Sequence, residues 1–272
     1  MNKDQRKLRK VVINYQQLLI LSRIYSYRFV STAQLQTILN KKQIQQVQQR
    51  LNLLLLRGWI GRNFSNIDRL TGRYASYYLL PAGLKVLKQN QDRFKPSINL
   101  NEKVLHNIYK DNSASKRFID HSLALGDINI HLDRLFGDKI KYLNKADLVT
   151  YDYLLKPLPD AFIIQKHRTK LSKDYFLEYF EESVPFFVHQ KRIKQYIEYK
   201  EEGDWSLMSS DDVPQNRFVA ENENLQRKIT KYTQKFIDNY YSLVPPILIT
   251  NLELLKTSPD AAVWYLINPD DD

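Results

Sequence analysis

The sequence predicts an α+β protein with a basic, helical N-terminal part and a second domain of mixed helices and strands. Three observations support this prediction. Apolar residues recur at helical spacing in three segments between residues 14 and 57. Two segments rich in aromatic and aliphatic residues follow between residues 59 and 80, and apolar strands alternate with helical segments from residue 115 onward. With 272 residues, 43% of them hydrophobic, the chain can form one large domain or two modest ones.

The N-terminal part begins with three expected helices. The first spans residues 14–27, where leucine, isoleucine and tyrosine form an apolar stripe. The second spans residues 31–39 and begins at Ser31, a residue type that caps helix N-termini. The third spans residues 41–57 and ends before Gly58, because glycine readily adopts the conformation that follows a helix.

The outward face of the third helix consists of amide and cationic side chains. Its members are Lys41, Lys42, Gln45, Gln46, Gln49 and Arg50. Glutamine can form two hydrogen bonds with adenine, whereas lysine and arginine bind guanine or phosphate. The face therefore predicts a DNA-reading surface, and an ordinary solvated helix surface is the alternative.

Two strands, over residues 59–64 and 75–80, are expected next, joined by a polar loop and followed by a helix over residues 81–87. Three helices and a basic hairpin form the winged-helix arrangement. In it the third helix enters the major groove, and the hairpin reaches the flanking backbone or the minor groove. The hairpin arginines expected to contact DNA are Arg62, Arg69 and Arg73. A winged helix that makes only protein contacts is the alternative.

Charge is distributed unevenly along the chain. Residues 1–100 contain 18 lysines and arginines and three acidic residues, a net charge of +15. Residues 101–272 contain 23 basic and 27 acidic residues, a net charge of −4. Because concentrated positive charge attracts a polyanion, double-stranded DNA is the expected partner.

Composition argues against several classes of protein. Without cysteine, the chain forms no disulfide framework, no cysteine-ligated zinc or iron–sulfur site and no thiol nucleophile. Neither a membrane span nor a signal peptide is expected, so we predict a cytoplasmic protein that does not enter a membrane. The sequence has no glycine-rich phosphate loop and no closely spaced histidine pair, which argues against a nucleotide-driven motor and a tyrosine-relaxase metal site.

A domain boundary is expected near Pro96, because residues 89–103 lack apolar periodicity. We assign residues 1–95 to the winged helix, residues 96–103 to a linker and residues 104–272 to the second domain. The second domain is expected to contain helices over 115–136, 185–201 and 223–241, and strands over 140–143, 148–153, 160–164, 175–180, 246–250 and 263–267.

Two carboxylates stand out on the central strands of the second domain. Asp160 begins one strand, and Glu178 lies within the apolar strand 175–180. A buried carboxylate requires a cation or a hydrogen-bond partner. If the strand register brings the two together, they could bind Mg²⁺ or Mn²⁺, which would activate water against a phosphodiester. Alternatively, Asp160 is a turn residue, and Glu178 pairs with Lys191 or Lys194 of the next helix.

Several segments, taken in order, resemble the replication-relaxation family of plasmid and mobile-element proteins. They are Thr32-Ala33-Gln34-Leu35, Arg50 to Ile60, Tyr78 to Gly83, His121 to Leu125, Leu158 to Ala161, Tyr175 to Glu178 and the helix of residues 191–199. The resemblance covers about residues 10–250. No single segment is specific, but the ordered set is typical of the family.

The resemblance implies a winged helix fused to a domain similar to PD-(D/E)XK restriction endonucleases, and a likeness to one class of relaxases. Asp160 and Glu178 would then be the catalytic carboxylates and metal ligands, with Mg²⁺ or Mn²⁺ as cofactor. Lys191 is a further catalytic candidate. The chain departs from such nucleases at Phe180, where they usually carry lysine. His121 is either a packed helix residue or a functional one.

Three hypotheses remain open at this point. In the first, the protein binds double-stranded DNA of a plasmid or mobile element during replication initiation or mobilisation, without cutting it. In the second, it is a metal-dependent DNA nickase at an origin. In the third, it is a transcriptional regulator whose second domain forms a homodimer. Other replication or mobilisation proteins are further expected partners.

Overall fold

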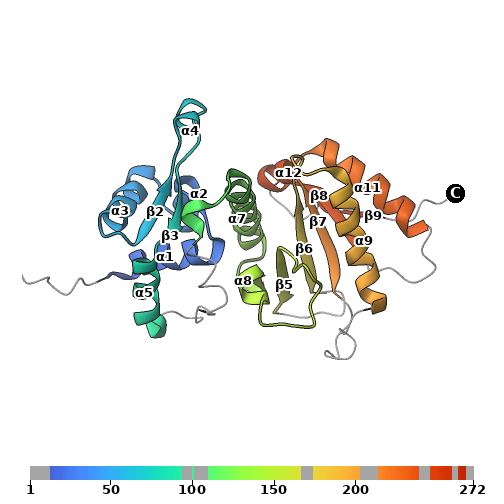
Figure 1. Cartoon of the computed structure of the whole chain (residues 1–272), viewed down its shortest axis with the longest axis horizontal. Coiled ribbons are helices and arrows are strands. Elements are labelled where there is room, and N and C mark those ends of the chain that lie inside the picture. Colours follow the sequence, from blue (N-terminus) through green and yellow to red (C-terminus); the bar gives the residue numbers. More distant parts are fainter. Residues whose placement is uncertain are drawn as a thin grey trace, which may run out of the picture. The chain divides into compact units, whose positions relative to one another are not determined.

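The computed structural model describes residues 13–93, 100, 110–166, 174–202, 214–238, 246–258 and 263–267. The chain divides into two compact units (Figure 1). The N-terminal unit comprises residues 1–100 and 105–113, and the C-terminal unit comprises residues 101–104 and 114–272. Apart from Leu100, the expected linker 96–103 lies outside the described residues.

The three expected helices of the N-terminal unit are present. They are α1 (Tyr15–Tyr27), α2 (Thr32–Ile38) and α3 (Ile44–Leu56). Capping boxes begin the first two: the side chains of Asn14 and Ser31 accept hydrogen bonds from the amides of Gln17 and Gln34. Each glutamine side chain accepts a bond in return from the backbone amide of the cap residue. Gly58 follows α3 with a positive φ of 64°, as its position predicts.

A three-stranded antiparallel sheet and one further helix complete the N-terminal unit. The strands lie in the order β1 (Val30–Ser31), β3 (Ser76–Leu79) and β2 (Ile60–Asn63), and the helix is α5 (Pro81–Gln89). The expected hairpin of β2 and β3 is therefore present. β1 was not predicted, because two residues are too short for a strand pattern and Val30–Ser31 is a strand only through its pairing with β3.

Two short segments of this unit also differ from the prediction. The connection between β2 and β3, expected to be a polar loop, contains a short helix, α4 (Asn66–Leu70), at the end of the hairpin (Figure 1). Residues 110–113, which the sequence assigned to the second domain, belong to the N-terminal unit. The reason is an ion pair between Asp111 and Arg28, in which the carboxylate is almost completely buried.

A six-stranded mixed sheet forms the centre of the C-terminal unit. Its strands, in spatial order, are β4 (Ile140–Asn144), β5 (Ala161–Gln165), β6 (Tyr175–Phe180), β7 (Gln215–Ala220), β8 (Ile247–Asn251) and β9 (Tyr265–Ile267). β6, β7 and β8 are parallel to one another, and the other neighbouring strands are antiparallel. β5 and β6, which follow one another in the sequence, form an antiparallel pair.

Helices cover both faces of this sheet. α7 (Lys116–Phe136) and α12 (Leu252–Thr257) pack on one face, and α9 (Phe186–Glu202) and α11 (Glu223–Asp238) pack on the other (Figure 1). Every residue of β6 is buried, because its side chains alternate between two apolar clusters. Leu177 joins the cluster beneath α7, and Phe176 joins the cluster beneath α9.

The C-terminal unit differs from the prediction at three places. The prediction of a strand over residues 148–153 is wrong, because the chain forms α8 (Lys145–Leu148) and then a turn. α8 is capped by Asn144 and Asp147, since the backbone amide of each donates a hydrogen bond to the side chain of the other. β7 was missed because its sequence is half polar, and it becomes a strand by pairing with β6 and β8. α12 was also missed, and it begins at the Asn251 cap directly after β8.

The prediction of an α+β fold is confirmed. None of the helices in the described ranges is long and apolar enough to span a membrane.

Candidate functional site

The outward face of α3 carries the residues expected to read DNA. Lys42, Gln45, Gln46 and Gln49 are exposed, on the side opposite the buried apolar residues of the helix. Lys41 and Arg50 are half-buried. Nη1 of Arg50 donates a hydrogen bond to the backbone carbonyl of Gln46 at 2.8 Å, which holds the guanidinium along the helix. The amide side chains are therefore accessible from outside the unit.

The β2–β3 hairpin adds three exposed arginines. They are Arg62 on β2, Arg69 on α4 and Arg73 in the turn before β3. Asp68 is the one acidic residue of the hairpin sequence, and its carboxylate accepts hydrogen bonds from the amide and the hydroxyl of Ser65. The hairpin therefore has a net charge of +2, with its acidic group engaged in a helix cap.

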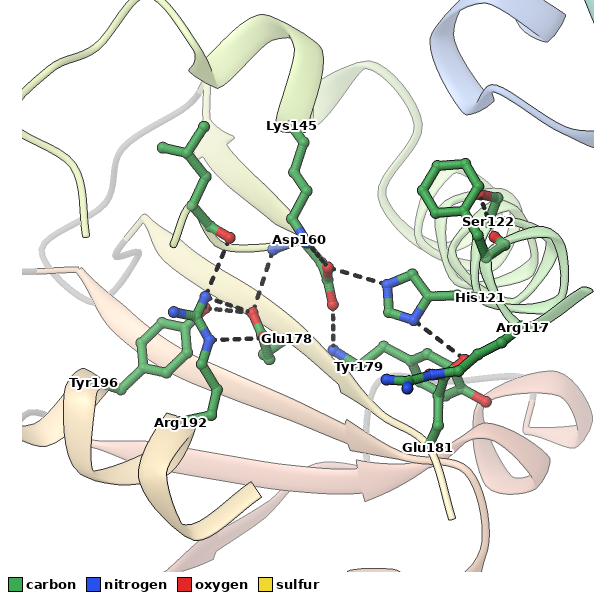
Figure 2. A network of polar contacts seen from close by, with 12 residues as sticks. Arg117, His121, Ser122, Lys145, Asp160, Glu178, Tyr179, Glu181, Arg192 and Tyr196 are labelled. Atoms are coloured by element: carbon green, nitrogen blue, oxygen red, sulfur yellow. Dashed lines mark hydrogen bonds and ion pairs between the residues drawn. The ribbon is translucent and has the colours of Figure 1, made fainter. Parts of the chain in front are cut away.

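In the C-terminal unit, Asp160, directly before β5, lies beside Glu178, near the end of β6 (Figure 2). The register pairs Ala161 with Leu177, so Asp160 and Glu178 form the next pair. The amide of Asp160 donates to Oε2 of Glu178 at 3.3 Å, and the amide of Tyr179 donates to Oδ2 of Asp160 at 2.8 Å. The register that the sequence left open thus places the two residues side by side, and each carboxylate accepts a hydrogen bond from a backbone amide of the neighbouring segment.

Two cations contact the carboxylate of Asp160. Nζ of Lys145, from α8, lies 2.5 Å from Oδ1, and Nε2 of His121, from α7, lies 3.1 Å from the same oxygen. Burial alone would raise the pKa of Asp160, but the charges of Lys145 and His121 hold that pKa well below its usual value. Asp160 is therefore ionised and already neutralised by side chains of this chain.

His121 links Asp160 to a third carboxylate. Its Nδ1 lies 3.4 Å from Oε1 of Glu181, and Nε of Arg117 lies 3.2 Å from Oε2 of Glu181. Burial alone would lower the pKa of His121, but Asp160 and Glu181 raise it to about 10. The imidazole ring is therefore protonated at neutral pH. Burial opposes ionisation of Glu181, yet His121 and Arg117 lower its pKa.

Glu178 is bound by side chains from α9. Nε of Arg192 donates to Oε1 of Glu178 at 2.7 Å, and Nη2 donates to Oε2 at 2.9 Å. The hydroxyl of Tyr196 donates to Oε2 at 2.7 Å. Arg192 also donates to the carbonyls of Pro157 and Leu158, so one buried guanidinium fixes both the carboxylate and the loop before Asp160.

The alternative in which Glu178 pairs with Lys191 or Lys194 is therefore wrong, because its partner is Arg192. Lys191 is exposed on α9 and lies outside the network, and Lys194 pairs with Glu198 at 3.2 Å. Because successive helix residues are rotated by about 100°, Lys191 points away from Glu178, whereas Arg192 and Tyr196, four residues apart, share the face that contacts it.

The network does not fit a resident divalent cation. Its three carboxylates face four cations when His121 is protonated, so the cluster already carries an excess positive charge. A metal at Oδ1 of Asp160 would have to displace Lys145 and His121. A metal at Glu178 would have to compete with Arg192 and Tyr196 for its oxygens and would weaken a buried ion pair. Within the described residues, no group of three or more His, Asp or Glu side chains is arranged to hold a metal ion.

Of the four cations of this network, sequence reasoning noted only His121 and missed Lys145, Arg117 and Arg192. Lys145 and Arg117 belong to no motif, and the only available signal was that a buried carboxylate needs a compensating charge. A better signal existed for Arg192, since it stands four residues before Tyr196 on the helix that follows Glu178. At Phe180, where PD-(D/E)XK nucleases usually carry lysine, the side chain packs against apolar and aromatic neighbours, and the ammonium group that contacts Asp160 belongs to Lys145.

Comparison with known families gives an independent assignment. The model of the replication-relaxation family matches residues 21–209, which is more than half of the chain. The chain belongs to the replication-relaxation family. No curated protein matches the sequence. The matched part of this replication-relaxation protein includes α3, the β2–β3 hairpin and the whole network around Asp160, so the resemblance found in the sequence is confirmed.

Proposed function

We propose that this replication-relaxation protein binds double-stranded DNA of a plasmid or other mobile element in the cytoplasm. On this proposal it acts in replication initiation or mobilisation without cutting the DNA. Membership of the family supports a role in replication or mobilisation. The order of elements in the N-terminal unit, three helices followed by a hairpin, supports a winged-helix mode of binding.

One observation carries the proposal: a single helix face and a single hairpin of the same unit expose amides and cations together. Gln45, Gln46 and Gln49 offer the side-chain amides that pair with adenine edges in the major groove. Lys42 and the hairpin arginines offer charge to the phosphates on either side. Because the described hairpin has one acid, already engaged by Ser65, repulsion of phosphate is small.

The network in the C-terminal unit supports binding rather than cutting. Each carboxylate that would hold a metal already has a cation from this chain within hydrogen-bond distance. The side chains of Lys145 and Arg117 are 51% and 59% exposed, so the network presents positive charge to solvent. Positive charge at this surface can contact a DNA backbone or an acidic surface of a further replication or mobilisation protein. We include a homodimer of this chain among the proposed partners.

Fluorescence anisotropy tests the binding site with labelled duplex fragments of the DNA that encodes the protein. Lys42→Ala, Gln46→Ala and Arg73→Ala are each expected to weaken binding. For the two cations, the slope of log affinity against log salt should become shallower by about one unit for each phosphate that the variant no longer neutralises. Lys88→Ala, which removes an exposed charge from α5 of the same unit, is the matched control and should bind like wild type. If all three variants also bind like wild type, the groove helix is assigned wrongly.

A nicking assay tests the claim that the DNA is not cut. Supercoiled plasmid carrying the tightest-binding fragment is incubated with the protein and Mg²⁺, Mn²⁺ or a chelator, and no relaxation is expected in any condition. Metal-dependent relaxation that Asp160→Ala and Glu178→Ala abolish would overturn the proposal in favour of a nickase.

A further inference from the structure

The end of the β2–β3 hairpin exposes four large apolar side chains. Ile67 and Leu70 of α4 are 68% and 86% exposed, and Phe64 and Tyr74, which flank the helix, are 40% and 55% exposed. We name these four residues the apolar tip. Figure 1 shows α4 at the far end of the hairpin, beyond the helices of its own unit. Burying one such side chain contributes about 1.5–3 kcal/mol, so a cluster left in water indicates a binding surface.

The apolar tip is held in a defined conformation. The amide of Ser65 donates to the carboxylate of Asp68 at 2.9 Å, and the amide of Asp68 donates back to the Ser65 hydroxyl at 3.1 Å. The hydroxyl of Thr71 donates to the carbonyl of Ile67 at 2.8 Å. Because Ile67 and Leu70 stand three positions apart on one helical turn, their side chains share a face. Two aliphatic side chains therefore project together from a structured turn.

Cations flank the apolar tip. Arg62, Arg69 and Arg73 are exposed on the same hairpin, and the carboxylate of Asp68 is engaged by Ser65. An apolar centre with a cationic rim complements the minor groove of duplex DNA. There arginines contact the groove and phosphates while leucine or isoleucine inserts between base pairs. An apolar protein surface would not require arginines beside the tip, and the vesicle experiment below separates DNA from an anionic lipid surface, which would also attract them.

We propose that Ile67 and Leu70 insert into the minor groove as a wedge, unstack one base step and bend the duplex. This inference rests on the proposed DNA binding and adds a deformation of the bound DNA to it. Unstacking costs a few kcal/mol per step, and inserted side chains of this kind bend DNA by roughly 20–90°. Contacts between the hairpin arginines and the bent backbone offset that cost. The protein would thereby open and bend DNA at its binding site without cutting it.

Two fluorescence signals on one duplex test the wedge. The tightest-binding fragment from the anisotropy experiment is shortened to about 30 base pairs and carries a donor and an acceptor dye at its ends. In separate duplexes, 2-aminopurine is placed at each TA or CA step, since these steps unstack most easily. Wild-type protein is expected to raise energy transfer between the ends and to raise 2-aminopurine fluorescence at one step.

Matched variants separate the wedge from general binding. The double variant Ile67→Ala, Leu70→Ala should lose most of both signals at saturating protein while keeping the wild-type salt slope, because its arginines are unchanged. Arg69→Ala should weaken binding and flatten the salt slope, yet give both signals at saturation. Phe187→Ala removes an apolar side chain of similar exposure, 69%, from α9 of the other unit and should behave like wild type. Circular dichroism melting should be unchanged in all variants, because the replaced side chains are exposed.

The outcomes distinguish the wedge from the proposed function. Wild-type binding without either signal overturns the wedge and leaves DNA binding standing, whereas no binding by wild type overturns both. A double variant that keeps both signals also overturns the wedge. Binding to phosphatidylglycerol-containing vesicles that depends on Ile67 and Leu70, without a response on DNA, would identify a membrane surface as the occupant and overturn the wedge as well.

Discussion

Replacement of His121 by glutamine tests the ionic link between α7 and the central sheet. His121 lies 3.1 Å from Asp160 and 3.4 Å from Glu181, and its ring contacts that of Tyr179 at a centroid distance of 5.5 Å. Glutamine keeps hydrogen-bonding capacity at similar size but carries no charge. The variant therefore removes one positive charge from between two carboxylates and leaves Lys145 on the first of them.

The pKa of His121 determines the expected size and pH dependence of the effect. It rises from 6.5 in the unfolded chain to about 10 in the folded protein. Because the folded state binds the proton more tightly, the stabilisation is complete below about pH 6.5 and is lost as the pH rises through 10. The difference corresponds to about 5 kcal/mol at about 1.4 kcal/mol per pKa unit. Since 21% of the side chain is exposed and water screens part of the interaction, we expect roughly 3–5 kcal/mol.

Urea unfolding followed by circular dichroism measures this contribution. Near pH 6 the free energy of unfolding of the wild type should exceed that of His121→Gln by roughly 3–5 kcal/mol. Near pH 9.5 the part of this difference that comes from the charge of His121 should fall to about 1 kcal/mol. Proton NMR provides a direct check, since the imidazole signal that is missing from the variant should titrate near pH 10 in the wild type. A stability difference that does not change with pH, or a ring that titrates near pH 6.5, would refute the reasoning.

Three further predictions concern the network and the N-terminal unit. Glu178→Gln leaves the guanidinium of Arg192 buried without a charged partner, so urea unfolding should show a loss of roughly 3–5 kcal/mol, part of which Arg192→Met should restore in the double variant. No recovery in the double variant would contradict the assigned ion pair. Gly83→Ala places a methyl group 2.1 Å from the carbonyl oxygen of Trp59, so the melting temperature should fall, with a destabilisation of about 1–3 kcal/mol. An unchanged melting temperature would argue against this close packing. Millimolar Mg²⁺ or Mn²⁺ should leave the melting temperature unchanged because cations of the chain already occupy the carboxylates, and a rise that Asp160→Asn abolishes would show that a metal displaces them.

Local features account for the elements that could be predicted from sequence. Asn14 and Ser31 cap helices whose apolar residues follow the helical period, and Gly58 ends α3, so each signal lies within a few residues of the structure that it specifies. β7 gave no such signal. Its polar residues are tolerated because strands pair with it on both sides, and that pairing involves segments remote in sequence.

The candidate site also has a part that could be predicted from sequence and a part that could not. Asp160 and Glu178 could be singled out from sequence, because a carboxylate in an apolar strand is costly to bury. Their pairing with Lys145 of α8, His121 of α7 and Arg192 of α9 could not be predicted, since these residues stand 15, 39 and 14 positions from the carboxylates that they contact. Arrangements of that kind depend on how whole helices pack against the sheet.

The sequence by itself determined the α+β class, the basic N-terminal part, the amide-rich face of α3 and the family. Charge, periodicity and the order of motifs can be read from it because each depends on residues that are close together in the chain. Only the tertiary structure decided what surrounds the two central carboxylates. Strand register pairs Asp160 with Glu178, and three helices then place lysine, histidine and arginine against their carboxylates. A buried carboxylate is stabilised by any cation that lies within hydrogen-bond distance. Which side chains lie there depends on how elements distant in sequence pack together, so the tertiary structure decides whether a lysine, histidine or arginine occupies the place of a metal ion.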